Sequence, residues 1–273
     1  MAPSVYALGA IALWATLASL GLALQHIPPF LLTGIALLVG SVPAWPLYRQ
    51  WRIPASTLLL GVCGLFGYHF LLFIALRHAP AVEANLVNYL WPLLIVVLAP
   101  VLLPGKRLTA VHLLAAGMGF AGAAIAIVGG REVSAQFAWG YLPALGAAVT
   151  WACYSLLTQR VAHFPTAAIG LFGLVSGALS LLCHFAMESR VDLSSQDWLL
   201  LAVMGLGPLG AAFFLWDKAL KGGNAQHIGI LSYLTPLCST VLLMQVSHRP
   251  MSWNIAAAAA LIIAAAILGT RAR

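Results

Sequence analysis

Polar and aromatic side chains gather in one short stretch of an otherwise apolar segment, "VNYLWPLLIVVLAP" at residues 87–100. Asn85, Asn88, Tyr89 and Pro92 follow the i, i+3, i+4, i+7 spacing of a single helix face, and Trp91 lies at its edge. Amide and phenol groups on such a face can bind a polar molecule in a cavity or hydrogen-bond neighbouring helices. Either role requires this face to point away from lipid.

Composition indicates why lipid is the surrounding medium. Of the 273 residues, 62% are hydrophobic and 7% are charged, and the mean hydropathy is +0.99. A soluble domain carries about 25% charged residues, so the apolar surplus must face a bilayer. The 13 basic residues occur singly or in pairs without forming a basic patch, which argues against a nucleic-acid partner. The four cysteines lie in apolar segments without a C-x-x-C pair, so neither a disulfide framework nor a zinc site is expected.

Ten segments are long and apolar enough to cross a membrane as helices, which needs about 20 residues each. The expected fold class is therefore all-α and integral to the membrane. The first segment has no basic region before it and no clear cleavage site, so we expect a retained helix rather than a signal peptide. Cutting at polar residues, prolines and glycines gives spans at 4–25, 28–48, 56–77, 81–103, 109–130, 138–160, 166–187, 197–220, 225–246 and 252–271.

The distribution of Lys and Arg predicts the orientation. If the N-terminus is cytoplasmic, nine of the 13 basic residues lie on the cytoplasmic side and four lie outside, at Arg77, Arg131, Arg190 and Arg249. This bias places both termini in the cytoplasm.

The chain repeats itself internally. Ala75-Leu-Arg77 and Asn88-Tyr-Leu-Trp-Pro92 match Ala219-Leu-Lys221 and Ser232-Tyr-Leu-Thr-Pro236 at an offset of 144 without a gap. Trp14 matches Trp151 at an offset of 137, and Lys106-Arg107 lies roughly opposite His248-Arg249. Two halves of five helices follow, at 1–130 and 138–273. Because five is odd, the second half enters the membrane inverted, as in many secondary transporters whose sites lie between the halves.

These features resemble the drug/metabolite transporter superfamily, in its EamA-type branch. Ten helices, inverted five-plus-five repeats and paired tryptophans in spans 1 and 6 carry the resemblance over the whole chain. "VNYLWP" with Glu83 upstream, and "SYLTP" in the second half, are similar to the aromatic amino acid exporters of this branch. The resemblance implies outward transport of aromatic and other hydrophobic amino acids from the cytoplasm of a bacterial-type cell, across its inner membrane.

Candidate site residues come from three places: the polar face of span 4 described above, the equivalent positions in the second half, and the aromatic residues in the middle of the spans. For each aromatic residue alone, ordinary packing is the alternative. The prolines at equivalent repeat positions suit gating helices, with a static kink as the alternative. His69 could relay protons or serve a structural hydrogen bond. The substrate-binding candidates are Trp14, Tyr68, Asn88, Tyr89, Trp91, Trp151, Tyr154, Ser232 and Tyr233, and the gating candidates are Pro92 and Pro236.

Three function classes remain to be compared. A membrane enzyme is disfavoured because no metal cluster, H-E-x-x-H, G-x-S-x-G or Walker A motif is present, and no cofactor is expected. A channel-like pore is the alternative, although the sequence shows no ring of charged residues of the kind that lines many channels. A transporter of small neutral molecules, either amino acids or another drug-like metabolite, is the leading prediction. A monomer is expected, although the small-residue faces in spans 5 and 10 could pack the bundle or make a dimer contact.

Overall fold

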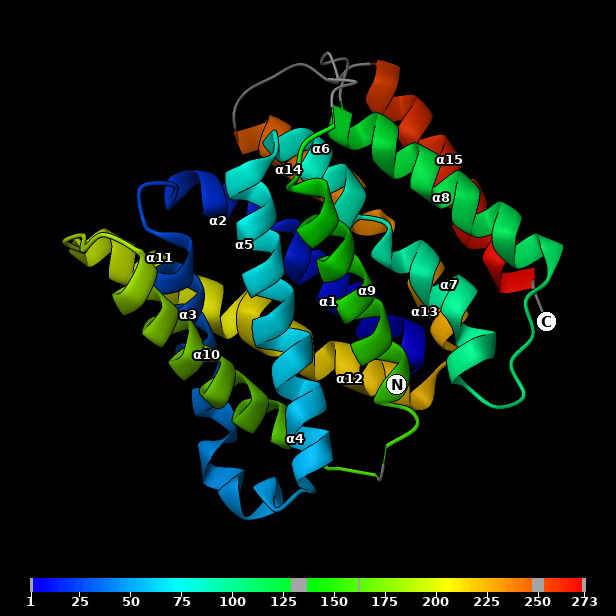
Figure 1. Cartoon of the computed structure of the whole chain (residues 1–273). Helices are drawn as coiled ribbons and strands as arrows, with labels where there is room; N and C mark the ends of the chain where they lie inside the picture. Colours follow the sequence, from blue (N-terminus) through cyan, green and yellow to red (C-terminus); the bar gives the residue numbers. More distant parts are fainter. Residues whose placement is uncertain (1, 129–136, 162, 247–252, 272–273) are drawn as a thin grey trace.

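The computed structural model describes residues 2–128, 137–161, 163–246 and 253–271, and every regular element in them is a helix (Figure 1). Four residues used in the charge count or the repeat lie outside the described residues: Arg131, His248, Arg249 and Arg273. The predicted C-terminal end of span 5 and the predicted N-terminal end of span 10 also lie outside them.

The first half contains five spans, several of them built from two or three consecutive helical segments. In chain order the segments are α1 (Pro3–Ala15), α2 (Leu17–Ala23), α3 (Pro29–Ser41), η1 (Val42–Trp51), α4 (Ala55–Val62), η2 (Cys63–Gly67), α5 (Tyr68–His78), α6 (Ala81–Asn88), α7 (Trp91–Leu102) and α8 (Ala110–Val128).

The second half has the same succession of five spans, but its first two spans are the single helices α9 and α10. Its segments are α9 (Tyr141–Leu157), α10 (Ala168–Met187), α11 (Ser195–Leu206), η3 (Gly207–Ala211), α12 (Ala212–Gly222), α13 (Ala225–Leu231), α14 (Leu234–Val246) and α15 (Trp253–Arg271).

Ten spans result, as the sequence predicted. Among the described residues, nine helical stretches have the length and hydropathy to cross a membrane, and the shorter apolar helix Tyr141–Leu157 is the tenth. The fold class is therefore all-α and membrane-spanning, in two inverted five-helix repeats.

The helix breaks occur at equivalent positions in the two halves. The π-helical segments η2 (Cys63–Gly67) and η3 (Gly207–Ala211) are separated by the repeat offset of 144. Span 4 is interrupted just before Trp91-Pro92, and span 9 just before Leu234. Pro92 occupies the first turn of α7, where its missing N–H has no helical partner to lose. Each half thus contains one π-helical span and one span broken before its proline at equivalent positions, and span 1 has a further break at Thr16 that the single helix α9 of span 6 lacks.

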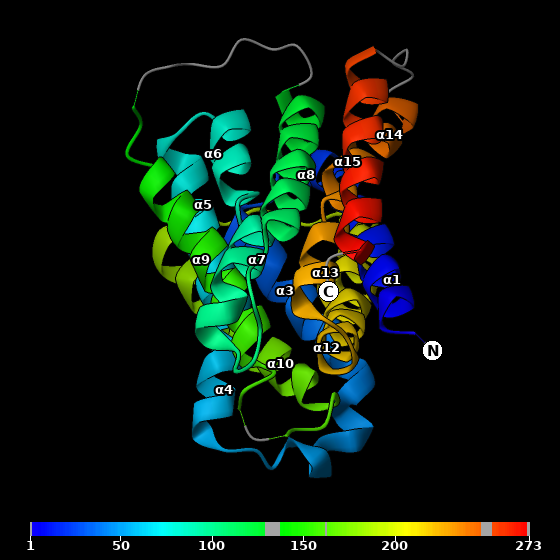
Figure 2. The ribbon, with the colours of Figure 1, turned by 90° about the vertical axis from the view of Figure 1, so that its right-hand side faces the viewer.

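Spans 2 and 7, and spans 5 and 10, pack as pairs across the repeat. α3 lies along α10 on one side of the bundle and α8 lies along α15 on the other (Figures 1 and 2). A Cβ on Gly177 would lie 2.9 Å from the carbonyl oxygen of Gly34, and a Cβ on Gly122 would lie 2.7 Å from Ile262. Small residues permit this close approach. Within the described residues, Gly122 of span 5 therefore packs against span 10, whereas Gly119 of the same span packs against Tyr233 of span 9.

Candidate functional site

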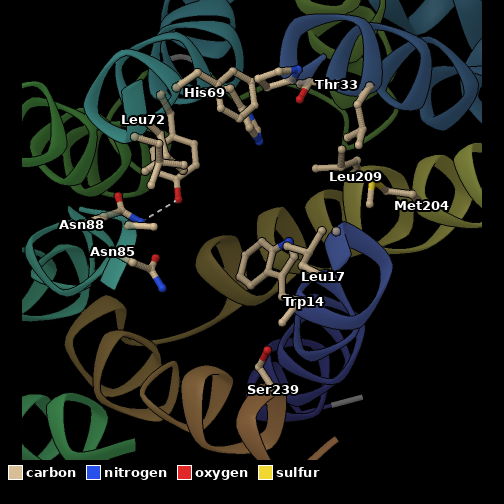
Figure 3. A pocket seen from close by; sticks show the side chains of 18 of the residues that line it. Trp14, Leu17, Thr33, His69, Leu72, Asn85, Asn88, Met204, Leu209 and Ser239 are labelled. Atoms are coloured by element: carbon tan, nitrogen blue, oxygen red, sulfur yellow. Dashed lines mark hydrogen bonds between the residues drawn. The ribbon is translucent and has the colours of Figure 1, made fainter. Parts of the chain in front are cut away.

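A cavity of about 720 Å³ lies between the two halves of the bundle. Spans 1 to 4 supply most of its walls, and spans 6, 8 and 9 supply the rest. Figure 3 shows Asn85 and Asn88 on one wall, facing Trp14 and Leu17 across the open space. The cavity is large enough for a small organic molecule.

Four tryptophans form the floor of this cavity. Trp14, Trp91 and Trp151 line it, and Trp216 lies beneath them with 1% of its surface exposed. The ring centroid of Trp216 is 5.2 Å from that of Trp14 and 5.7 Å from that of Trp91. The Trp14 indole N–H donates to the carbonyl of Pro208 at 3.1 Å, which fixes span 1 to span 8. The floor is therefore a packed aromatic layer shared by both halves.

The wall opposite Trp14 is polar but carries no formal charge. Asn88 donates a hydrogen bond from Nδ2 to the Tyr68 hydroxyl at 3.1 Å, drawn as a dashed line in Figure 3. The Nδ1 atom of His69 lies 2.6 Å from the Leu65 carbonyl oxygen. Among the described residues that line the cavity, none is Lys, Arg, Asp or Glu. Such a lining suits a molecule with no net charge and an apolar body.

Below the floor, a buried ion pair joins span 8 to the connection between spans 6 and 7. Lys221 Nζ lies 2.7 Å from Asp217 Oδ2, which also accepts a hydrogen bond from the Thr166 hydroxyl at 2.7 Å. Lys221 donates a second bond to the Phe164 carbonyl at 2.8 Å and sits over the Phe164 ring. These contacts tie the lower end of span 8 to its own half.

At the mouth of the cavity, Glu188 holds three spans together. Its side chain is 2% exposed; one carboxylate oxygen accepts from Arg77 at 3.0 Å, and the other lies 3.0 Å from His184 Nδ1. The same oxygens accept the backbone N–H groups of Phe30 and Leu31 at the start of α3. A carboxylate at a helix N-terminus is stabilised by the free N–H groups there. These contacts fix the ends of spans 2, 3 and 7 to one another, next to the lining residues Pro29 and Leu76.

The structure brings most of the sequence-predicted residues into this one cavity. The residues that line it are Trp14, Tyr68, His69, Asn88, Tyr89, Trp91 and Trp151. Neither of the gating candidates lines it. Pro92 and Pro236 are both buried, and the Pro92 carbonyl approaches Gly229 of the other half.

Three predicted residues lie outside the cavity because each packs against another span. The Tyr154 ring fills the space above Gly64. The Ser232 hydroxyl donates to the carbonyl of Gly229 at 2.6 Å. Tyr233 is fully buried with its ring against Gly119 of α8. The expectation that these three face the cavity is therefore not met.

Other lining residues escaped the sequence analysis although the repeat pointed to two of them. Phe213 is the counterpart of His69, and Thr235 is the counterpart of Trp91, both at the offset of 144. Applying the offset to every polar or aromatic position would have found them. Leu72 and Ser239 also line the cavity, and no sequence signal distinguishes them from neighbouring residues.

Among the described residues, no group of three or more His, Cys, Asp and Glu side chains could hold a metal ion. What the cavity offers is neutral hydrogen-bonding groups on one wall and an aromatic floor.

Comparison with known proteins agrees with this architecture. The EamA-like transporter family model matches twice, at residues 2–128 and 138–271. The chain is 40% identical to the aromatic amino acid exporter YddG of Ancylobacter novellus, over 96% of this chain and 94% of that protein. It is 26% identical to the exporter of the same name from Escherichia coli K12, over 85% of this chain and 82% of that protein. A solved crystal structure superposes with a TM-score of 0.92 at 40% identity, covering 98% of this chain and 96% of the other. The chain belongs to the EamA-like transporter family.

Proposed function

We propose that this chain exports aromatic and other hydrophobic amino acids across a bacterial-type inner membrane, by alternating access through the central cavity. The observation that carries the proposal is the cavity itself, which is uncharged, partly aromatic and closed at one end by the tryptophan floor. Amino acids with apolar side chains are neutral zwitterions that suit such walls. The names of the two exporters described above support the same substrate class.

The charge distribution supports an outward-open state. The mouth residues Gln25 and Leu76 lie at the ends of spans 1 and 3, next to Arg77. The closed end lies near Lys221, which is one of the nine basic residues counted for the cytoplasmic side. By the positive-inside rule the closed end is cytoplasmic, with both termini on that side.

The packed floor favours a carrier over a channel-like pore, because an open pore needs a continuous path. In this proposal, spans 4 and 9 move at their breaks, and Pro92 and Pro236 act at those breaks as gating residues. Hinges of this kind absorb backbone changes at a few positions. In this proposal the substrate in the outward-open state contacts the polar wall at Tyr68, Asn88 and Tyr89. It also contacts the three floor tryptophans that line the cavity, which are Trp14, Trp91 and Trp151.

Transport in proteoliposomes tests this proposal. Radiolabelled phenylalanine should show saturable flux with stimulation by phenylalanine on the opposite side, and tryptophan should compete. Trp151→Ala should change the preference among phenylalanine, threonine and methionine, because it removes an indole from the floor. Trp198→Ala is the matched control, since Trp198 is 53% exposed on the outer surface of span 8.

Flux that never saturates would identify a pore instead. If the Trp151→Ala variant is monodisperse and has an unchanged substrate ranking, the cavity is not the site of selection.

A further inference from the structure

The structure fixes the hydrogen-bonding role of one cavity side chain, His69. The π-helical segment η2 ends at Gly67, two residues before it, and the His69 Nδ1 atom lies 2.6 Å from the carbonyl oxygen of Leu65. A carbonyl oxygen can only accept, so Nδ1 carries the proton. The other nitrogen of a neutral imidazole, Nε2, then has a lone pair and no hydrogen.

This lone pair has no partner within the described part of the chain. The structure shows no hydrogen bond to Nε2, and the imidazole lies in the cavity wall (Figure 3). His69 therefore offers an acceptor to whatever molecule enters the cavity, and that molecule must supply a donor.

The surroundings of the imidazole favour a cationic donor. The rings of Tyr68, Phe73 and Phe213 lie with their centroids 5.0, 6.0 and 6.5 Å from that of His69. An ammonium group bound at Nε2 would lie among these rings, and aromatic faces attract ammonium groups. The described lining residues include neither Lys or Arg to hold a carboxylate nor Asp or Glu to hold an ammonium group, so the preference at this place depends on Nε2 itself. At this place in the wall an ammonium group can donate to Nε2, whereas a carboxylate has no hydrogen to donate.

We propose that His69 Nε2 accepts a hydrogen bond from the α-ammonium group of the substrate. His69 is then a specificity-determining residue that selects amino acids over the carboxylic acids that lack the amino group. This inference rests on the proposed function, because it names how the same cavity recognises an amino acid. Passing a proton through both ring nitrogens would break the bond to Leu65, so any proton exchange by His69 is confined to Nε2.

Three ligands with the same phenyl group separate the contributions of the two charged groups. Phenylalanine carries both groups, phenethylamine carries only the ammonium, and 3-phenylpropionate carries only the carboxylate. In competition against radiolabelled phenylalanine on the purified wild-type protein, 3-phenylpropionate should bind about tenfold or more weakly, which is the effect of losing one hydrogen bond to a charged group. Phenethylamine should lose less affinity than that.

His69→Phe introduces the residue found at the equivalent position in the other half, Phe213. It should weaken phenylalanine and phenethylamine by about tenfold or more and leave 3-phenylpropionate within about twofold, because that ligand has no group for Nε2. His69→Gln should recover part of the affinity, since its side-chain carbonyl is again an acceptor. Leu72→Ala, at a lining position whose side chain makes no hydrogen bonds, is the control and should affect all three ligands alike.

Two results would overturn this inference. One is wild-type binding of 3-phenylpropionate at least as tight as that of phenylalanine. The other is an equal loss for all three ligands in His69→Phe. If His69→Phe does not fold, the wild-type series and His69→Gln decide. If the wild-type protein transports and binds no amino acid, the proposed function fails and this inference falls with it.

Discussion

Equivalent side chains in the two halves lie in opposite surroundings. In spans 3 and 4, Leu72, Leu76 and Asn85 line the cavity. Their counterparts at the offset of 144 are Trp216, Leu220 and Gly229, which are all buried. Two inverted repeats with equivalent π-helical segments and equivalent breaks in spans 4 and 9 therefore hold one face open and the equivalent face closed. Exchanging the two arrangements would open the opposite end of the bundle, which is the geometric basis of alternating access.

The positions nearest the centre of the bundle do not follow this rule. Trp14 and its counterpart Trp151 both line the cavity, as do His69 and its counterpart Phe213. Central positions are shared by both halves, and positions farther along the spans differ. This pattern is expected if the site stays in place while the ends of the spans open and close around it.

The largest expected effect on stability comes from the closed face, which contains Trp216, Leu220 and Gly229. Trp216→Ala should lower the free energy of unfolding by about 3–5 kcal/mol, because it empties a fully buried indole site. Leu72→Ala, at the counterpart position, should cost clearly less, since Leu72 is only half-buried and borders the cavity. Thermal or denaturant unfolding in detergent measures both variants. Equal losses would mean that the two faces differ in shape but not in packing energy.

A smaller effect is expected from an asymmetry in the sequence itself. Asp217 pairs with Lys221 at the closed end, whereas the counterparts at the open end are Phe73 and Arg77, which cannot pair in this way. Asp217→Asn should lower stability by about 1.5–3 kcal/mol through weakened charged hydrogen bonds. It should also increase the rate at which a membrane-impermeant maleimide, added from the cytoplasmic side, labels a cysteine placed at Leu220 in the closed end.

Asp192→Asn is the matched control, because Asp192 is exposed and should tolerate the change. If both aspartate variants unfold at the wild-type temperature, the buried pair contributes little to closure.

Much of this fold was predictable from the sequence because lipid enforces a simple rule. Apolar segments of about 20 residues must be spanning helices. The repeated "YL-x-P" strings marked the equivalent breaks in spans 4 and 9. The cavity was predictable only in part. Tyr89 and Tyr233 occupy equivalent positions in the sequence, yet one lines the cavity and the other is buried against Gly119. The sequence pattern is symmetric while the conformation is not, so no sequence pattern could tell the two tyrosines apart. The π-helical segments were also missed, since their glycines do not specify an i→i+5 hydrogen bond.

Access to Leu76 and Leu220 during transport tests the central claim most directly. Each is replaced by cysteine in turn, in a background whose four native cysteines are removed, and probed with a membrane-impermeant maleimide from either side. Without substrate, Leu76→Cys should react from outside, because Leu76 is 39% exposed at the mouth, and Leu220→Cys should not react, because Leu220 is 1% exposed.

During phenylalanine transport, Leu76→Cys should react more slowly, and Leu220→Cys should become reactive from the cytoplasmic side. If Leu220→Cys stays unreactive while the variant still transports phenylalanine, the two halves do not exchange their arrangements and the account is contradicted.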